Sequence, residues 1–129
     1  MRALDYAITS TNNYIEKMPK SQRKSYGQFF TSRETAMFMA GLFEIPTGKD
    51  ELHILDAGAG SGILSLALIE RLQSEAGIKH ISLVCYETDS SIADLLYSNL
   101  DYACKKSKID IEYEIRKDNY ILSQMFEYN

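Results

Sequence analysis

The stretch of sequence that decides the fold is Ile54-Leu55-Asp56-Ala57-Gly58-Ala59-Gly60-Ser61-Gly62-Ile63-Leu64. An apolar run, Leu52 to Leu55, leads into this stretch and predicts a buried parallel strand. The residues from about Gly62 to Gln73 predict a helix packed against a sheet. Glycines alternate between the two elements, at positions 58, 60 and 62. Because such a turn lets a ligand approach the backbone closely, it predicts a binding site at the carboxyl end of the strand.

The chain continues with further units of the same kind. Ile81–Tyr86 predicts a second strand, Ser90 to about Lys105 a second crossover helix, and Ile109–Ile115 a third strand. Strands that alternate with helices in this way indicate an α/β fold with right-handed crossovers. Residues 120–129 are too few to add another such unit, so we expect an incomplete sheet of about three parallel strands.

A helical extension is predicted ahead of the sheet. Apolar residues recur at intervals of three and four positions in a stripe that Pro19 ends: Leu4, Ala7, Ile8, Thr11, Tyr14, Ile15 and Met18. A polar linker follows, in which Gly27 is expected to break the chain direction. Between positions 17 and 33 it carries no acidic residue and these basic ones: Lys17, Lys20, Arg23, Lys24 and Arg33.

A second helix is predicted after the linker. Thr31 with Glu34 three positions later is typical of a capped helix start, and Ala36–Phe43 is expected to form the buried body of that helix. These observations divide the chain into a helical N-terminal extension, residues 1–32, and a partial α/β domain, residues 33–129.

Composition limits the classes of function. A chain of 129 residues with 45% hydrophobic content fits one small globular domain. Its formal charge of −4 and pI near 5.2 exclude a nucleic-acid footprint over the whole surface, so any DNA contact must be local or come from elsewhere. Cys85 and Cys104 lack metal-type spacing and are interpreted as reduced thiols. No signal peptide or membrane span is predicted, and we expect a cytoplasmic protein.

Two acidic residues indicate the ligand. A dinucleotide fingerprint would need a third glycine at position 63, where this chain has Ile63. Asp56 instead suits S-adenosylmethionine, whose ammonium and sulfonium groups attract a carboxylate, although an aspartate here can also simply cap the turn. Glu87, at the end of the second strand, favours the ligand, because its carboxylate can accept both hydroxyls of a ribose. Asp89 is interpreted as the N-cap of the next helix.

These residues resemble the adenine-specific DNA methyltransferases of bacterial restriction and modification systems. The glycine turn is similar to that family's cofactor motif, and Glu87 matches its ribose-binding acid. Tyr26-Gly27-Gln28-Phe29-Phe30-Thr31-Ser32 resembles the segment that folds over the bound cofactor. The resemblance implies a Rossmann-like S-adenosylmethionine-dependent methyltransferase fold and covers nearly the whole chain.

The resemblance also implies roles for individual residues. Thr31 would touch the methionine end of the cofactor, and one of the two phenylalanines before it is expected in the core. Asp118, with Asn119 beside it, would accept a hydrogen bond from the cofactor's adenine amine, although such a pair is also common in turns. The cofactor-binding residues implied are Phe30, Thr31, Asp56, Gly58, Gly60, Gly62, Glu87, Thr88, Asp118 and Asn119. No metal ligand is predicted.

The residues that bind the target base have no counterpart in this sequence. In the family an Asn-Pro-Pro-Tyr or Asp-Pro-Pro-Tyr motif holds the flipped adenine, whereas the prolines here are Pro19 and Pro46. No catalytic residue is therefore predicted. The leading hypothesis is the S-adenosylmethionine-binding portion of a DNA adenine methyltransferase, inactive by itself. Two alternatives stay open, a methyltransferase of protein, RNA or a small molecule, and a non-catalytic interaction module.

The resemblance finally implies that the strand Leu52–Leu55 is central in a complete sheet and lies at an edge here. An unpaired strand edge flanked by apolar side chains tends to pair with another chain. We therefore expect either self-association through this strand or its coverage by the N-terminal helix.

Overall fold

The computed structural model describes residues 1–75 and 77–127 of the protein. In chain order the elements are α1 (Ala3–Glu16), α2 (Lys20–Phe29), α3 (Arg33–Leu42), β1 (Glu51–Asp56), α4 (Ile63–Leu72), β2 (His80–Tyr86), α5 (Ser90–Lys106), β3 (Asp110–Arg116) and α6 (Tyr120–Glu127). Within these residues no helix has the length and apolar character needed to cross a membrane.

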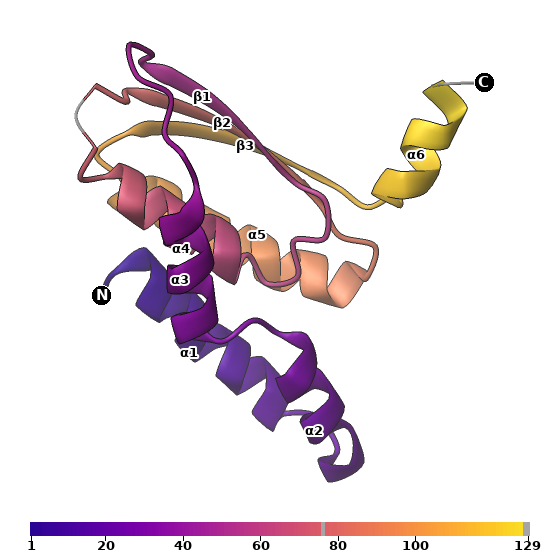
Figure 1. The fold of residues 1–129 in the computed structure, drawn as a ribbon. Helices are drawn as coiled ribbons and strands as arrows, with labels where there is room; N and C mark the ends of the chain where they lie inside the picture. Colours follow the sequence, from indigo (N-terminus) through magenta and orange to yellow (C-terminus); the bar gives the residue numbers. More distant parts are fainter. Residues whose placement is uncertain (76, 128–129) are drawn as a thin grey trace.

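The strands form one parallel sheet in the order β1-β2-β3 (Figure 1). Ile54 pairs with Leu83 of the central strand, and Leu83 pairs with Tyr113. The predicted α/β architecture is confirmed, and each predicted strand lies within its observed element or starts one residue early. Strand β1 lies at one edge of this sheet, as expected.

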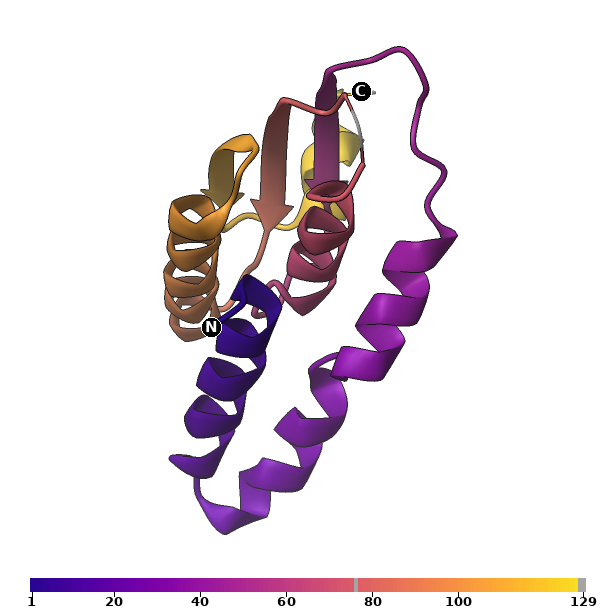
Figure 2. The same cartoon turned by 90° about the vertical axis from the view of Figure 1, so that its left-hand side faces the viewer.

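Helices α4 and α5 cover one face of the sheet, and the other face is open in the described part of the chain (Figure 2). Residues along β3 alternate accordingly, with Ile111 and Tyr113 half-buried toward the helices and Glu112 and Glu114 exposed. The same alternation occurs in β1, where Leu55 is 50% exposed. The prediction that β1 is buried was therefore wrong, because covering on both faces would need helices on the open side.

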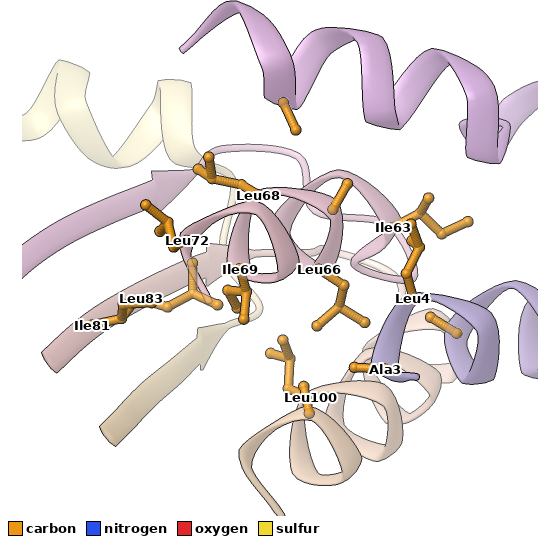
Figure 3. Close-up of a cluster of buried hydrophobic side chains, with 14 of the residues drawn as sticks. Ala3, Leu4, Ile63, Leu66, Leu68, Ile69, Leu72, Ile81, Leu83 and Leu100 are labelled. Carbon is orange, nitrogen blue, oxygen red and sulfur yellow. The ribbon is translucent and has the colours of Figure 1, made fainter. Parts of the chain in front are cut away.

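The core lies where α4 meets its neighbours. Helix α4 is buried nearly all round, since it is enclosed by the sheet, α1, α3 and α5. Leu4 of α1, Leu66 of α4 and Leu100 of α5 converge in this cluster (Figure 3). Each is at most 1% exposed, and burying such a side chain stabilises the fold by about 1.5–3 kcal/mol.

Helix α1 packs on α4 and α5 rather than on the sheet edge. Its predicted apolar stripe is confirmed, with Leu4, Ala7 and Thr11 buried. Tyr6 stacks on Tyr102 of α5, with ring centroids 4.0 Å apart. The expectation that α1 covers β1 was wrong, because the two helices of the crossovers offer the stripe a larger apolar surface.

The basic segment expected to be a linker is helix α2. Lysine, arginine and glutamine all favour helices, and Pro19 takes the N-cap, where its missing amide is not needed. Gly27 continues the helix with a negative φ, so it does not break the chain direction. None of the residues of α2 is buried, which explains why the sequence has no apolar periodicity from which this helix could be predicted.

Helix α3 begins one residue later than predicted. Ser32 is the N-cap, and its hydroxyl accepts a hydrogen bond from the amide of Thr35 at 3.2 Å. The assignment of Thr31 as the cap was wrong, because the next residue, Ser32, also carries a hydroxyl and occupies the N-cap position. The helix is also less buried than expected. Only Ala36 and Ala40 face the core, and the remaining large apolar side chains are exposed: Met37, Phe38, Met39, Leu42 and Phe43.

Candidate functional site

The three alternating glycines have different roles in the turn between β1 and α4. Gly60 and Gly62 have φ of +56° and +88°, in the left-handed region that L side chains avoid. A Cβ on Gly62 would also lie 2.7 Å from Cδ1 of the buried Leu96. Gly58 has neither constraint, and nothing lies within 4 Å of the position a Cβ would take. The backbone at Gly58 is therefore open to a close approach by a ligand.

Glu87 is the buried acid of the site. It follows β2 directly and is 8% exposed. Its Oε1 accepts a hydrogen bond from the Gly60 amide and its Oε2 one from the Asp89 amide, each at 3.0 Å. An ionised carboxylate has about four acceptor positions, so both oxygens keep lone pairs for another donor. The carboxylate is thus held against the glycine turn with acceptor capacity to spare.

Asp56 is held by the helix that follows it. Its Oδ2 accepts a hydrogen bond of 2.6 Å from the hydroxyl of Ser65, a buried residue of α4. The side chain is half-buried at the end of β1. Burial, with Asp56 adding to it, raises the pKa of the neighbouring Cys85 thiol to about 12. This thiol is therefore protonated at neutral pH, in agreement with its interpretation as a reduced core residue.

Phe30 folds over the glycine turn. Two atoms of its ring lie 3.9 and 4.0 Å from the position that a Cβ on Gly60 would take. The ring also meets Tyr14 edge-on, with centroids 6.3 Å apart, and Phe29 at 5.3 Å. Phe30 is 9% exposed and Phe29 is 60% exposed, which confirms that one of the two is a core residue. Thr31, which follows Phe30 in the chain, is half-buried.

The residues after β3 complete the same edge of the sheet. The backbone amide of Glu87 bonds the carbonyl of Arg116 at 2.9 Å, so the ends of β2 and β3 are joined. Asp118 is exposed just beyond this point, as is Thr88 beyond β2. Asn119 starts α6, because its Oδ1 accepts a hydrogen bond from the Leu122 amide at 3.1 Å. Helix capping therefore accounts for the side chain of Asn119, whereas the Asp118 carboxylate has no hydrogen bond among the described residues.

The predicted residues thus lie around one edge of the sheet. Asp56, Glu87 and Asp118 follow β1, β2 and β3 in turn, and parallel strands bring their carboxyl ends to the same side. Asp89, by contrast, caps α5 as predicted and accepts from the amides of Ser91 and Ile92. No group of histidine, cysteine, aspartate or glutamate within residues 1–75 and 77–127 could hold a metal ion.

A buried polar network behind the turn was missed by sequence reasoning. The Ser61 hydroxyl lies 2.9 Å from that of Thr11 on α1, and its carbonyl accepts a hydrogen bond of 2.8 Å from the amide group of Asn99 on α5. Asn99 in turn accepts one of 2.6 Å from the hydroxyl of Ser10. Thr11, Ser61 and Asn99 are at most 2% exposed. The sequence does carry one partial signal. Asn99 sits on the apolar stripe of α5, three residues after Leu96, which indicates a buried polar side chain but does not identify its partners.

Two cavities in the described part of the chain lie outside the glycine turn. One of about 310 Å³ lies beside β1, is lined mainly by apolar residues such as Leu52, Ile54 and Leu68, and reaches Asp56 and Ser65. The other, of about 760 Å³, lies between the start of α1 and the ends of α4 and α5, away from the glycine turn. Ligands of parallel α/β sheets bind at the carboxyl ends of the strands, so the glycine turn is the better site.

Comparison with known proteins gives relatives in sequence and in fold. The chain is 34% identical over 110 residues to the Type II methyltransferase M.PstI of Providencia stuartii, which covers 84% of this chain and 20% of that protein. It is 37% identical over 102 residues to the Type II methyltransferase M.BsuBI of Bacillus subtilis, covering 77% of this chain and 19% of that protein. The chain thus spans about one fifth of the length of these relatives. No protein-family model matches it.

A solved structure supports the same conclusion at the level of fold. A crystal structure described as a class I S-adenosylmethionine-dependent methyltransferase of Listeria monocytogenes superimposes with a TM-score of 0.50 and 15% identity, covering 81% of this chain and 35% of that one. The chain is therefore related over most of its length to the Type II methyltransferases of restriction and modification systems, and its fold is part of a Rossmann-like S-adenosylmethionine-dependent methyltransferase fold with a helical N-terminal extension.

Proposed function

We propose that this chain is the S-adenosylmethionine-binding portion of an adenine-specific DNA methyltransferase. The observation that carries the proposal is the position of Glu87, a buried carboxylate that bonds the glycine turn through one oxygen and keeps further acceptor positions. A ribose with two adjacent hydroxyls matches such an acceptor. When bound, S-adenosylmethionine supplies a methyl group on a positively charged sulfur.

Each remaining residue around the turn has a part in holding that cofactor. Asp56, oriented by Ser65, would attract the ammonium group of the methionine end. The free amides at the start of α4 suit its carboxylate. Phe30 and Thr31 would close over the bound molecule from the segment that ends at residue 32, and Asp118 would accept from the adenine amine.

The protein's contribution here is binding and orientation. Burial of Glu87 strengthens its hydrogen bonds, because the carboxylate is removed from water. Phe30 excludes water from the backbone of the turn. Methyl transfer also needs the target adenine to be held at near-attack distance from the cofactor. The Asn/Asp-Pro-Pro-Tyr motif that would hold this adenine is not among these residues. We therefore expect cofactor binding without methylation of DNA by these residues alone.

Calorimetric titration of the chain with S-adenosylhomocysteine tests the proposal. Glu87→Gln keeps the shape of the side chain and removes its charge, and losing a charged hydrogen-bond partner costs about 1.5–3 kcal/mol, or about 10- to 150-fold in Kd. Asp94→Asn, on the exposed side of α5, is the matched control and should bind as the unchanged chain does. Absence of binding at millimolar ligand, or equal binding by Glu87→Gln, would refute the assignment.

We also propose that copies of the chain associate through the exposed edge of β1. The unpaired edge lies beside the 310 Å³ cavity, and Leu55 on its open face is half exposed. Edge strands with apolar flanks pair readily, and a charge placed on them prevents pairing. Light scattering should therefore show dimers at high concentration, and Leu55→Lys should give a monomer. A monomer at every concentration would contradict this part.

A further inference from the structure

One short segment of this acidic protein carries basic residues without any acidic ones. Residues 17–33 contain five basic side chains and no acidic one, while the whole chain has 14 basic and 18 acidic residues. The rest of the chain therefore has 14 − 5 = 9 basic residues against 18 acidic ones, a formal charge of −9. This segment, which is α2 with its flanks, stands out as a positive region on a negative molecule.

The cations of α2 share one face of the helix. Lys20, Arg23 and Lys24 are spaced by three and four residues, so they lie on one side. Tyr26 and Phe29 lie on another side, where Tyr26 contacts Phe30 at a centroid distance of 6.4 Å. The aromatic side therefore joins α2 to the segment over the glycine turn, and the basic side is left facing outward.

These cations have no acidic partner in the described part of the chain. Lys17, Lys20 and Lys24 make no ion pair there, and Arg23 donates only to the carbonyl of Met18, at 3.1 Å. All are exposed. In contrast, Arg33 at the start of α3 is paired with Asp5. Unpaired, exposed cations on one helix face repel each other, and an external polyanion would relieve that repulsion.

The position of α2 relates this face to the candidate cofactor site. The strands point their carboxyl ends toward the end of the molecule at which α2 projects, and both views show this arrangement (Figures 1 and 2). Phe30, directly after α2, touches the glycine turn. A macromolecular substrate that approaches the carboxyl ends of the strands from this end of the molecule would therefore pass close to α2.

We propose that the basic face of α2 binds the phosphate backbone of double-stranded DNA next to the cofactor site. This inference rests on the proposed function and adds to it the surface that meets the substrate. Lys20 to Lys24 spans about 6 Å of helix axis, and each DNA strand carries one phosphate per about 3.4 Å of its own axis. The face can therefore neutralise two or three phosphates.

The salt dependence of DNA binding tests this proposal. Fluorescence anisotropy with a labelled duplex would give Kd over a series of salt concentrations for the whole 129-residue chain and for the variant Lys20→Gln/Arg23→Gln/Lys24→Gln. Each phosphate contact contributes about 0.9 to the slope of log K against log salt. The variant should therefore lose about 2–3 from the magnitude of the slope and bind more weakly at low salt.

The control removes the same number of positive charges at the amino ends of the strands, opposite the candidate site. Lys49, Lys79 and Lys108 precede β1, β2 and β3, and each is exposed without an ion pair among the described residues. Their triple glutamine variant should keep the slope of the unchanged chain. Equal losses in both variants would overturn the proposal, because net charge alone would then explain them. So would an unchanged slope in the α2 variant, no DNA binding at low salt, or tighter binding of duplex RNA.

Titration of the same proteins with S-adenosylhomocysteine separates the two proposals. The α2 variant should bind this ligand as the unchanged chain does, since its three cations do not touch the glycine turn. If the α2 variant binds S-adenosylhomocysteine and its DNA binding has an unaltered salt dependence, the role of α2 is refuted and the proposed function stays in place. DNA binding that depends on α2, without any cofactor binding, would refute the proposed function instead.

Discussion

Replacing Gly62 with alanine is expected to destabilise the fold by about 2–5 kcal/mol. The left-handed backbone at φ +88° accounts for about 1–2 kcal/mol of this in any L residue. The new Cβ would also lie 2.7 Å from Cδ1 of Leu96, and overpacking of this kind costs about 1–3 kcal/mol. Leu96 is 0% exposed, so its Cδ1 can move away only by displacing its packed neighbours in the core.

Urea unfolding followed by circular dichroism measures this loss. With an m value of about 2 kcal/mol/M, which is typical of a small domain, the urea midpoint should fall by about 1–2.5 M. Gly58→Ala is the matched control in the same turn. It has open space and no left-handed φ, so its effect should stay within about 0.5 kcal/mol.

A second variant separates the two contributions. In a Leu96→Ala background the overlapping methyl group is gone, so Gly62→Ala should then cost only the backbone part, about 1–2 kcal/mol. The reasoning would be refuted if Gly62→Ala cost no more than Gly58→Ala, or if its cost did not fall in that background.

Three further predictions concern other parts of the molecule. Thr11→Val should cost about 1–3 kcal/mol, because it leaves the buried hydroxyl of Ser61 without this partner, and Thr11→Ser should restore most of the loss in thermal unfolding. Hydrogen bonds, chiefly with Asp110, raise the pKa of His80 above 6.5, so their stabilisation is present below about pH 6.5 and is lost as pH rises through the raised pKa. Urea midpoints from pH 5 to 9 should show this decline, and His80→Gln should remove it. Cys85, with a pKa of about 12, should react with a thiol reagent at neutral pH only after unfolding, and rapid labelling of Cys85 in a folded Cys104→Ser variant would contradict its burial.

The strand, turn and helix around residues 52–73 could be predicted because their signals are local. An apolar run, alternating glycines and a helical stripe follow each other without interruption. Helix α2 was missed for the opposite reason, since its residues favour a helix but bury nothing that would produce a periodic pattern. The burial of α3 was overestimated because an apolar residue does not reveal whether a partner faces it. Met37 and Phe38 are 55% and 69% exposed.

The candidate site was predicted only in part. Glu87 and Asp56 could be identified from their position at strand ends, because parallel strands bring those ends together. The network that holds Ser61 could not, since it joins residues 38 and 50 positions apart in the sequence. Contacts of that range depend on how α1 and α5 pack, and a pattern within one helix carries no information about its neighbour.

The long separation between α1 and its partners has a consequence during synthesis. The hydroxyl of Tyr6 on α1 is hydrogen-bonded to that of Ser98 on α5, which is made 92 residues later. At about 5–20 residues per second, this takes the ribosome about 5–20 s. Throughout that interval the apolar stripe of the first helix lacks its α5 partner, although α4 is already made for the latter part of it, so part of the stripe is open to chaperones and to other nascent chains. Completion of α5 ends this exposure, and at the same moment Thr11 and Asn99 can close on the glycine turn from both sides.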